Sequence, residues 1–63
     1  MSAREKSVAA LLLHGLRNRD IGTELGISEG TVKVHLHRIY EKLGVGSRTE
    51  LILVASKMLG RAS

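Results

Sequence analysis

The sequence of 63 residues contains no cysteine, proline, phenylalanine or tryptophan, and Tyr40 is its one aromatic residue. Without cysteine, neither a disulfide framework nor a thiolate metal site can form. The scarcity of aromatic side chains disfavours stacking on single-stranded nucleic acid and anchoring of a basic amphipathic helix at a membrane surface. The longest apolar run, Val8–Leu13, is too short for a membrane span or a signal-peptide core.

The charge is predominantly positive, with 10 Lys+Arg against 6 Asp+Glu and a sequence pI of about 10.1. For so small a chain this balance favours an anionic partner, nucleic acid ahead of an acidic membrane. A chain of this length forms a single domain, residues 1–63, with a small core and no room for a deep catalytic cleft. The carboxylates are scattered, with neither a nucleophile–base pair nor a phosphate loop, so we expect no enzyme.

Capping residues and glycines divide the chain into four expected helices, at about residues 3–14, 19–25, 29–43 and 48–59. Four residues have the positions of N-caps: Ser2, Asn18, Ser28 and Ser47. Glu5 and Glu50 complete capping boxes at the first and last of these. Glycines suited to helix ends follow the first three helices: Gly15, Gly26 and Gly44. No stretch alternates with a period of two, so the expected fold is all-α, a four-helix bundle without strands.

The stretch Leu25–Tyr40, LGISEGTVKVHLHRIY, predicts a helix-turn-helix, in which Gly26 suits the tight turn. Spacing predicts an apolar seam between its two helices, formed by Ile21, Leu25, Ile27 and Val32. At about 100° per residue, one sector of the helix at 29–43 is apolar and must face the core: Val32, Leu36, Ile39 and Leu43. The opposite side is mainly basic: Gly30, Lys33, Val34, His37, Arg38 and Glu41.

This basic side suits the major groove of DNA. Lys33 can donate to guanine, Val34 can touch a thymine methyl group, and His37 can reach a base edge. Four further residues are candidate phosphate ligands: Ser28 and Thr31 at the helix N-terminus, where free N–H groups favour anions, and His35 and Arg38. The alternatives are an ordinary solvated face with an incidental valine, and a protein-interaction module that has kept the bundle.

The three histidines do not suggest a metal site. His35 and His37 are two residues apart and diverge on a helix, and His14 lies on another helix. We therefore expect neither a metal nor another cofactor.

The last helix has two apolar directions. One wide arc could close the bundle: Leu51, Val54, Ala55, Met58 and Leu59. Ile52 lies at its edge and Leu53 points nearly the opposite way, which suggests contact with a second copy. A single exposed leucine is also common on protein surfaces. One short helix offers little area, so we expect weak or no dimerisation of the free domain.

Taken together, the motifs resemble the LuxR/NarL-type (GerE-like) helix-turn-helix domain of bacterial transcription regulators. The resemblance covers about Met1 to Ser56 and rests on segments in order: Met1-Ser2-Ala3-Arg4-Glu5, Gly15-Leu16 with Asn18 and Ile21, Leu25-Gly26-Ile27-Ser28, Thr31-Val32-Lys33-Val34-His35, Lys42-Leu43-Gly44-Val45 and Ser47-Arg48-Thr49-Glu50. Met1 stands where the family usually has Leu, and Gly22 where Ala is common. Many members of the family carry Ser, Asn or Lys at the position of His37, so their base preference at this position cannot be transferred to this chain.

The resemblance implies that the third helix enters the major groove, with Lys33, Val34 and His37 facing bases. It implies that the domain forms a homodimer on DNA through the fourth helix, so that two domains read an inverted or direct repeat. We assign this dimer contact to Ile52, Leu53 and Ser56. It also implies a bacterial, cytoplasmic protein, associated with the nucleoid when bound. The domain is either the C-terminal effector domain of a longer regulator, which we expect, or a short stand-alone regulator. RNA polymerase is left open as a further partner.

Overall fold

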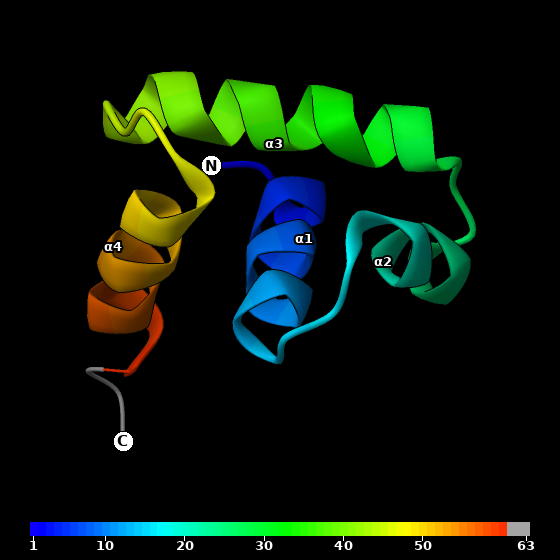
Figure 1. The fold of residues 1–63 in the computed structure, drawn as a ribbon, viewed down its shortest axis with the longest axis horizontal. Coiled ribbons are helices and arrows are strands. Elements are labelled where there is room, and N and C mark those ends of the chain that lie inside the picture. Colours follow the sequence, from blue (N-terminus) through cyan, green and yellow to red (C-terminus); the bar gives the residue numbers. More distant parts are fainter. Residues whose placement is uncertain (61–63) are drawn as a thin grey trace.

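The computed structural model describes the backbone of residues 1–60 and the side chains of residues 1–58. It contains four helices, α1 (Ala3–Leu13), α2 (Asn18–Leu25), α3 (Glu29–Leu43) and α4 (Arg48–Gly60), and residues 1–60 include no strand. The long helix α3 runs along one side of the molecule, and the other three helices all lie beneath it (Figure 1). The predicted all-α, four-helix fold is confirmed. No helix of the described part is long and apolar enough to cross a membrane.

Local capping explains where three of the helices begin. The Ser2 hydroxyl accepts a hydrogen bond from the Glu5 amide at 3.2 Å, and the Glu5 carboxylate accepts one from the Ser2 amide at 2.9 Å. Ser28 Oγ accepts from the Thr31 amide at 3.1 Å at the start of α3. Ser47 Oγ accepts from the Glu50 amide at 3.1 Å before α4. These bonds satisfy backbone donors that have no partner within the helix.

Asn18, predicted as the N-cap of α2, is not a cap. The helix begins at Asn18 itself, and Arg17 precedes it without a side-chain capping bond. Asn18 Oδ1 instead accepts a hydrogen bond from Arg48 Nη1 at 2.8 Å. A charged guanidinium is a stronger donor than a backbone amide, and it draws the asparagine toward α4. This side chain therefore joins α2 to α4 rather than starting α2.

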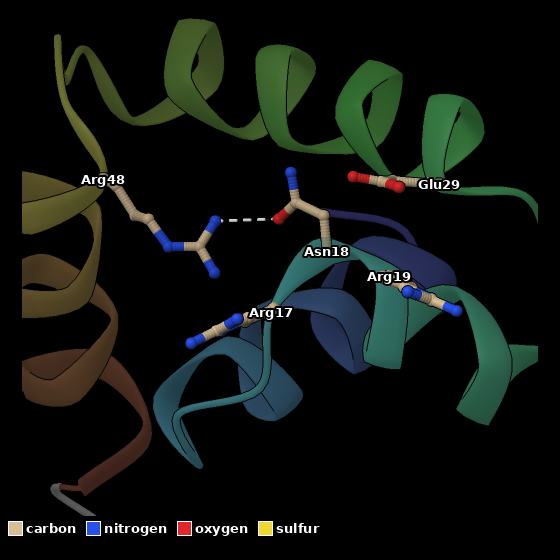
Figure 2. A pocket seen from close by; sticks show the side chains of 5 residues that line it. All are labelled: Arg17, Asn18, Arg19, Glu29 and Arg48. Atoms are coloured by element: carbon tan, nitrogen blue, oxygen red, sulfur yellow. Dashed lines mark hydrogen bonds between the residues drawn. The ribbon is translucent and has the colours of Figure 1, made fainter.

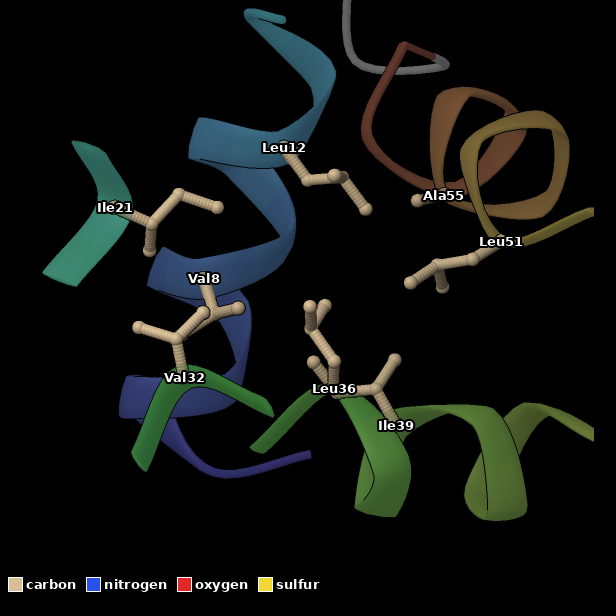
Figure 3. Packing of buried hydrophobic residues seen from close by; sticks show 8 residues of the cluster. All are labelled: Val8, Leu12, Ile21, Val32, Leu36, Ile39, Leu51 and Ala55. Atoms are coloured by element: carbon tan, nitrogen blue, oxygen red, sulfur yellow. The ribbon is translucent and has the colours of Figure 1, made fainter. Parts of the chain in front are cut away.

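Buried side chains from all four helices form one core (Figure 3): Val8, Leu12, Ile21, Val32, Leu36, Ile39, Leu51 and Ala55. Leu25 and Ile27 pack against this cluster half-buried, in agreement with the predicted seam of the helix-turn-helix. Leu43, predicted to point inward, is only half-buried at the edge of the cluster, because α3 ends there.

An ion pair between a buried carboxylate and an exposed lysine joins α1 to α3. Glu5 is only 3% exposed, and Lys42 Nζ lies 2.7 Å from its Oε1. The hydrogen bond from Lys42, followed by the one from the Ser2 amide, lowers the pKa of Glu5 to about 2, although burial opposes the shift. The same carboxylate thus caps α1 and fixes the C-terminal part of α3 over it.

Candidate nucleic-acid interface

The outer face of α3 carries all three residues predicted to read bases. Lys33, Val34 and His37 are exposed, and Val34 is 50% exposed although it is apolar. The burial of Val32 and Ile39, both without exposed surface, fixes this orientation of the helix. Since α1, α2 and α4 lie on the opposite side of α3 (Figure 1), no other helix of residues 1–60 covers this face. The outer, largely basic face of α3 is therefore accessible to a ligand along the helix.

Ser28 and Thr31, both predicted phosphate ligands, lie together at the N-terminus of α3. Their hydroxyl oxygens are 2.9 Å apart, and either one can be the donor. Whichever donates, the hydroxyl hydrogen of the other remains free to point outward. The pair can therefore cap the helix and still offer one O–H to an anion at a terminus that already favours negative charge.

The other two predicted phosphate ligands differ in exposure. Arg38 is exposed, whereas His35 is half-buried. The Nδ1 atom of His35 is buried and has no hydrogen-bond partner, so only Nε2 remains available to a phosphate. The His35 ring is thus partly packed against the protein, and a phosphate contact of His35 would use Nε2.

Glu41 places a negative charge on the same face of α3. Its Oε1 lies 3.6 Å from Nε2 of His37, one helical turn away, and both side chains are largely exposed. Exposed pairs of this kind contribute little to stability.

A basic hollow lies beside the start of α3, and sequence reasoning did not predict it. It has a volume of about 470 Å³ and is lined by Arg17, Asn18, Arg19, Glu29 and Arg48 (Figure 2). From the sequence, Arg17 is only part of the connector between the first two helices. The one available signal was the pair of arginines on either side of Asn18.

The exposed surface of α4 agrees in part with the prediction. Leu53 is 59% exposed and Ser56 is exposed, whereas Ile52 is half-buried against the core. Met58, predicted to help close the bundle, is 52% exposed. Among the described side chains of α4, Ala55 is the last buried one, one turn earlier. Leu59, also assigned to that arc, has its side chain outside the described residues.

His14, predicted to lie on the first helix, is the C-cap residue that follows α1, and the other two histidines lie on α3. Among the described side chains, no group of three or more His, Cys, Asp or Glu residues is placed to hold a metal ion.

Comparison with known proteins gives consistent matches. A family model, GerE, bacterial regulatory proteins of the luxR family, matches residues 1–55. An HTH-type transcriptional regulator of Aeromonas salmonicida is 51% identical over 51 residues, which are 81% of this chain and 26% of the regulator. Response regulator protein TmoT of Ectopseudomonas mendocina is 41% identical over 58 residues, 92% of this chain and 26% of TmoT. The chain thus spans about a quarter of the length of these relatives.

Solved structures agree with these matches. Transcription factor GerE superposes with a TM-score of 0.83 and 37% identity, covering 95% of this chain and 88% of GerE. The response regulator ChrA of a heme-sensing two-component system gives a TM-score of 0.82 and 48% identity, over 92% of this chain and 28% of ChrA. The chain therefore belongs to the luxR family of bacterial regulatory proteins, and it forms the DNA-binding helix-turn-helix domain of that family.

Proposed function

We propose that this domain binds specific sequences of double-stranded DNA in the bacterial cytoplasm and thereby regulates transcription, with α3 in the major groove. The observation that carries the proposal is the orientation of α3. Val32, Leu36 and Ile39 are buried, and no other described helix covers the opposite, basic side (Figure 1). An α-helix about 10–12 Å across fits a groove about 12 Å wide.

The residues of this face have complementary roles in the proposal. Lys33 donates to the O6 and N7 acceptors of guanine, Val34 contacts a thymine methyl group, and His37 reaches a base edge. The Ser28–Thr31 pair, His35 through Nε2, and Arg38 hold phosphates, which position the helix without reading sequence. Support comes from the exposure of Lys33, Val34 and His37, and from the free hydroxyl hydrogen at the α3 N-terminus.

We further propose that two copies bind together on DNA through α4, with Ile52, Leu53 and Ser56 at the contact. The exposed Leu53 supplies an apolar centre for it. The area available on one short helix is small compared with that of a stable protein–protein interface. The pairing is therefore formed on DNA, where the two half-sites hold the copies close to each other.

The relatives are about four times as long as the matched region, which supports a place for this domain within a longer regulator. We propose that it is the C-terminal effector domain of such a protein. In that setting, RNA polymerase is a candidate protein partner of the bound dimer.

Selection of bound duplexes from a random pool, followed by sequencing, tests the proposal. We expect enrichment of one motif, and its repetition in inverted or direct order would report the pairing of two domains. Affinity for the selected site should fall steeply with salt, because each neutralised phosphate releases counterions. If no motif is enriched, or if binding to a protein partner proves insensitive to salt while no duplex is bound, the domain is an interaction module instead.

A further inference from the structure

His37 differs from the other two proposed base-reading residues because its hydrogen-bonding character changes when it takes up a proton. A histidine side chain gains or loses its ring proton between about pH 5 and pH 8. The neutral imidazole has one N–H donor and one acceptor nitrogen, whereas the imidazolium has two donors and no acceptor. Lys33 can only donate, and the side chain of Val34 has no polar atom. Of these three residues on the outer face of α3, only His37 can therefore recognise different bases at different pH.

The His37 ring is free to turn toward a ligand. Its side chain is 75% exposed, and neither of its ring nitrogens makes a hydrogen bond within the described part of the chain. The Glu41 carboxylate lies 3.6 Å from Nε2, which is too far for a hydrogen bond. The ring can therefore bind a base without breaking a hydrogen bond of the free domain.

The charged groups around His37 belong to its own helix. Lys33 lies one turn before it on α3, Arg38 directly follows it, and Glu41 lies one turn after it. The helices α1, α2 and α4 lie on the other side of α3 (Figure 1), so no helix of residues 1–60 brings a charged group against the side that carries His37. These two cations and one anion surround the ring with and without DNA. The charge that changes on binding is therefore the charge of the DNA.

Bound DNA favours the protonated form of this ring, and that form has a restricted choice of bases. The phosphates of a duplex are negatively charged, and a nearby opposite charge stabilises the charged form of a titratable group. In the major groove guanine presents two acceptors, O6 and N7, whereas cytosine and adenine each present an amino group that donates. The imidazolium can donate to guanine but has no acceptor for an amino group. The neutral ring can bond to either kind of base.

We propose that His37 makes base recognition by this domain depend on protonation. The imidazolium selects guanine at one position of the DNA site, and the neutral ring also accepts the amino group of adenine or cytosine at that position. This inference rests on the proposed function and adds to it both the class of base and the uptake of a proton on binding. Because the complex holds a proton that the free domain holds less tightly, affinity for the guanine site rises as the pH falls from 8 to 6.

Protonation of the other two histidines has a different consequence. His14 follows α1 at the end of that helix that points away from α3 (Figure 1), and a charge there strengthens attraction to all duplexes alike. His35, through Nε2, is a proposed phosphate ligand, and phosphate contacts carry no direct sequence information. A motif that changes with pH at one position is therefore the signature of His37.

Selection from a random pool of duplexes at pH 6 and at pH 8 tests the inference. For the wild type we expect guanine to dominate one position at pH 6, and adenine or cytosine to join it there at pH 8. His37→Asn should give the same motif at both pH values. His37→Lys carries its charge at both and should keep the guanine. His14→Asn removes a histidine that is equally classed as exposed and serves as the matched control, so its two motifs should differ as those of the wild type do.

Titrations of duplexes that differ only at this base pair measure the proton linkage. Wild-type affinity for the guanine duplex should rise roughly fivefold or more from pH 8 to pH 6. The change should be clearly smaller in His37→Asn, and the ratio of the two proteins removes the contributions of His14 and His35. Equal pH dependence of the wild type and His37→Asn would overturn the inference, as would identical wild-type motifs at the two pH values.

The remaining outcomes separate the possible failures. If the wild type enriches no motif at either pH, the proposed function itself has failed. If the wild type selects DNA and loses its pH dependence in His37→Asn, but the pH changes its affinity for all duplexes by the same factor, the ring binds a phosphate and the proposed base selection is wrong.

Discussion

Lys42, near the end of α3, lies 2.7 Å from the buried carboxylate of Glu5 in the first turn of α1. The pair holds the C-terminal half of the proposed recognition helix against the body of the domain. Because the pKa of Glu5 is lowered to about 2 from its ordinary value of 4.5, the folded protein holds this proton less tightly than the unfolded chain. The stability that the carboxylate contributes is therefore complete above about pH 4.5 and is lost as the pH falls toward 2.

The first prediction concerns this acid sensitivity. Glu5→Gln keeps an oxygen that can accept from the Ser2 amide but cannot be ionised. We expect its thermal midpoint to be lower than that of wild type at pH 7, and the difference to shrink steadily between pH 4.5 and pH 2. Glu24→Gln, at an exposed position on α2, serves as the control and should follow the wild-type profile. A constant difference between Glu5→Gln and wild type across this range would show that the ion pair is not responsible.

The second prediction concerns Asn18. Asn18→Ala removes the acceptor of Arg48 Nη1 and leaves a half-buried guanidinium without one of its partners, at a cost of about 1–3 kcal/mol. If Asn18 were the N-cap, a serine in its place would restore most of the stability. We expect Asn18→Ser to be nearly as unstable as Asn18→Ala, because the shorter hydroxyl side chain falls short of Arg48. Denaturant unfolding of the three proteins distinguishes the two roles, and full rescue by serine would argue for a cap.

The third prediction concerns Gly22. From the sequence, the only consequence of glycine here is a loss of helix propensity, worth up to about 1 kcal/mol. In the structure, a Cβ atom at Gly22 would lie 2.6 Å from the Ile27 carbonyl oxygen in the turn before α3. Overpacking of this kind typically costs about 1–3 kcal/mol. We therefore expect Gly22→Ala to lower the free energy of unfolding despite the better propensity.

Gly30→Ala is the matched control for this substitution. Gly30 is also helical, but a Cβ atom there would meet only Ser28 Oγ at 3.8 Å. Its propensity gain is unopposed, so we expect a small increase in thermal midpoint. A stabilised Gly22→Ala would mean that the turn before α3 can move outward easily.

The features that could be predicted from the sequence depend on neighbours along the chain. The Ser2 and Ser28 caps join residues three apart, and the buried positions of α3 follow from helical periodicity. Local patterns of this kind were sufficient for the fold and for the exposed face that carries Lys33.

The features that the sequence could not reveal join distant residues. Glu5 and Lys42 are 37 positions apart, and Asn18 and Arg48 are 30 apart. Each of these four residues has a plausible local role as a cap or a solvated charge, and nothing in their spacing specifies a partner. The basic hollow was missed for the same reason, because Arg48, at the start of α4, comes near Arg17 and Arg19 only in the folded domain.

The fourth prediction concerns pairing on DNA. Leu53→Asp changes a residue that is 59% exposed, so the free domain should change in stability by no more than about 0.5 kcal/mol. We expect it to bind a single half-site as wild type does and to lose cooperativity on a duplex with two half-sites. Ser7→Asp on α1, also exposed, introduces the same charge elsewhere and should keep the cooperativity. Titrations of one-site and two-site duplexes measure this, and retained cooperativity in Leu53→Asp would place the contact elsewhere.

The fifth prediction separates base reading from phosphate binding on α3. Lys33→Ala should cost about 1–3 kcal/mol on the selected site and, because it removes a base contact, should relax the preference at one position of the motif. Arg38→Ala, which removes a proposed phosphate ligand from the same exposed face, should weaken all duplexes by a similar factor and leave the motif unchanged. Repeating the random-pool selection with each variant gives the comparison directly. If Lys33→Ala recovers the wild-type motif at lower affinity, its ammonium group binds the backbone, and base reading must rest on Val34 and His37.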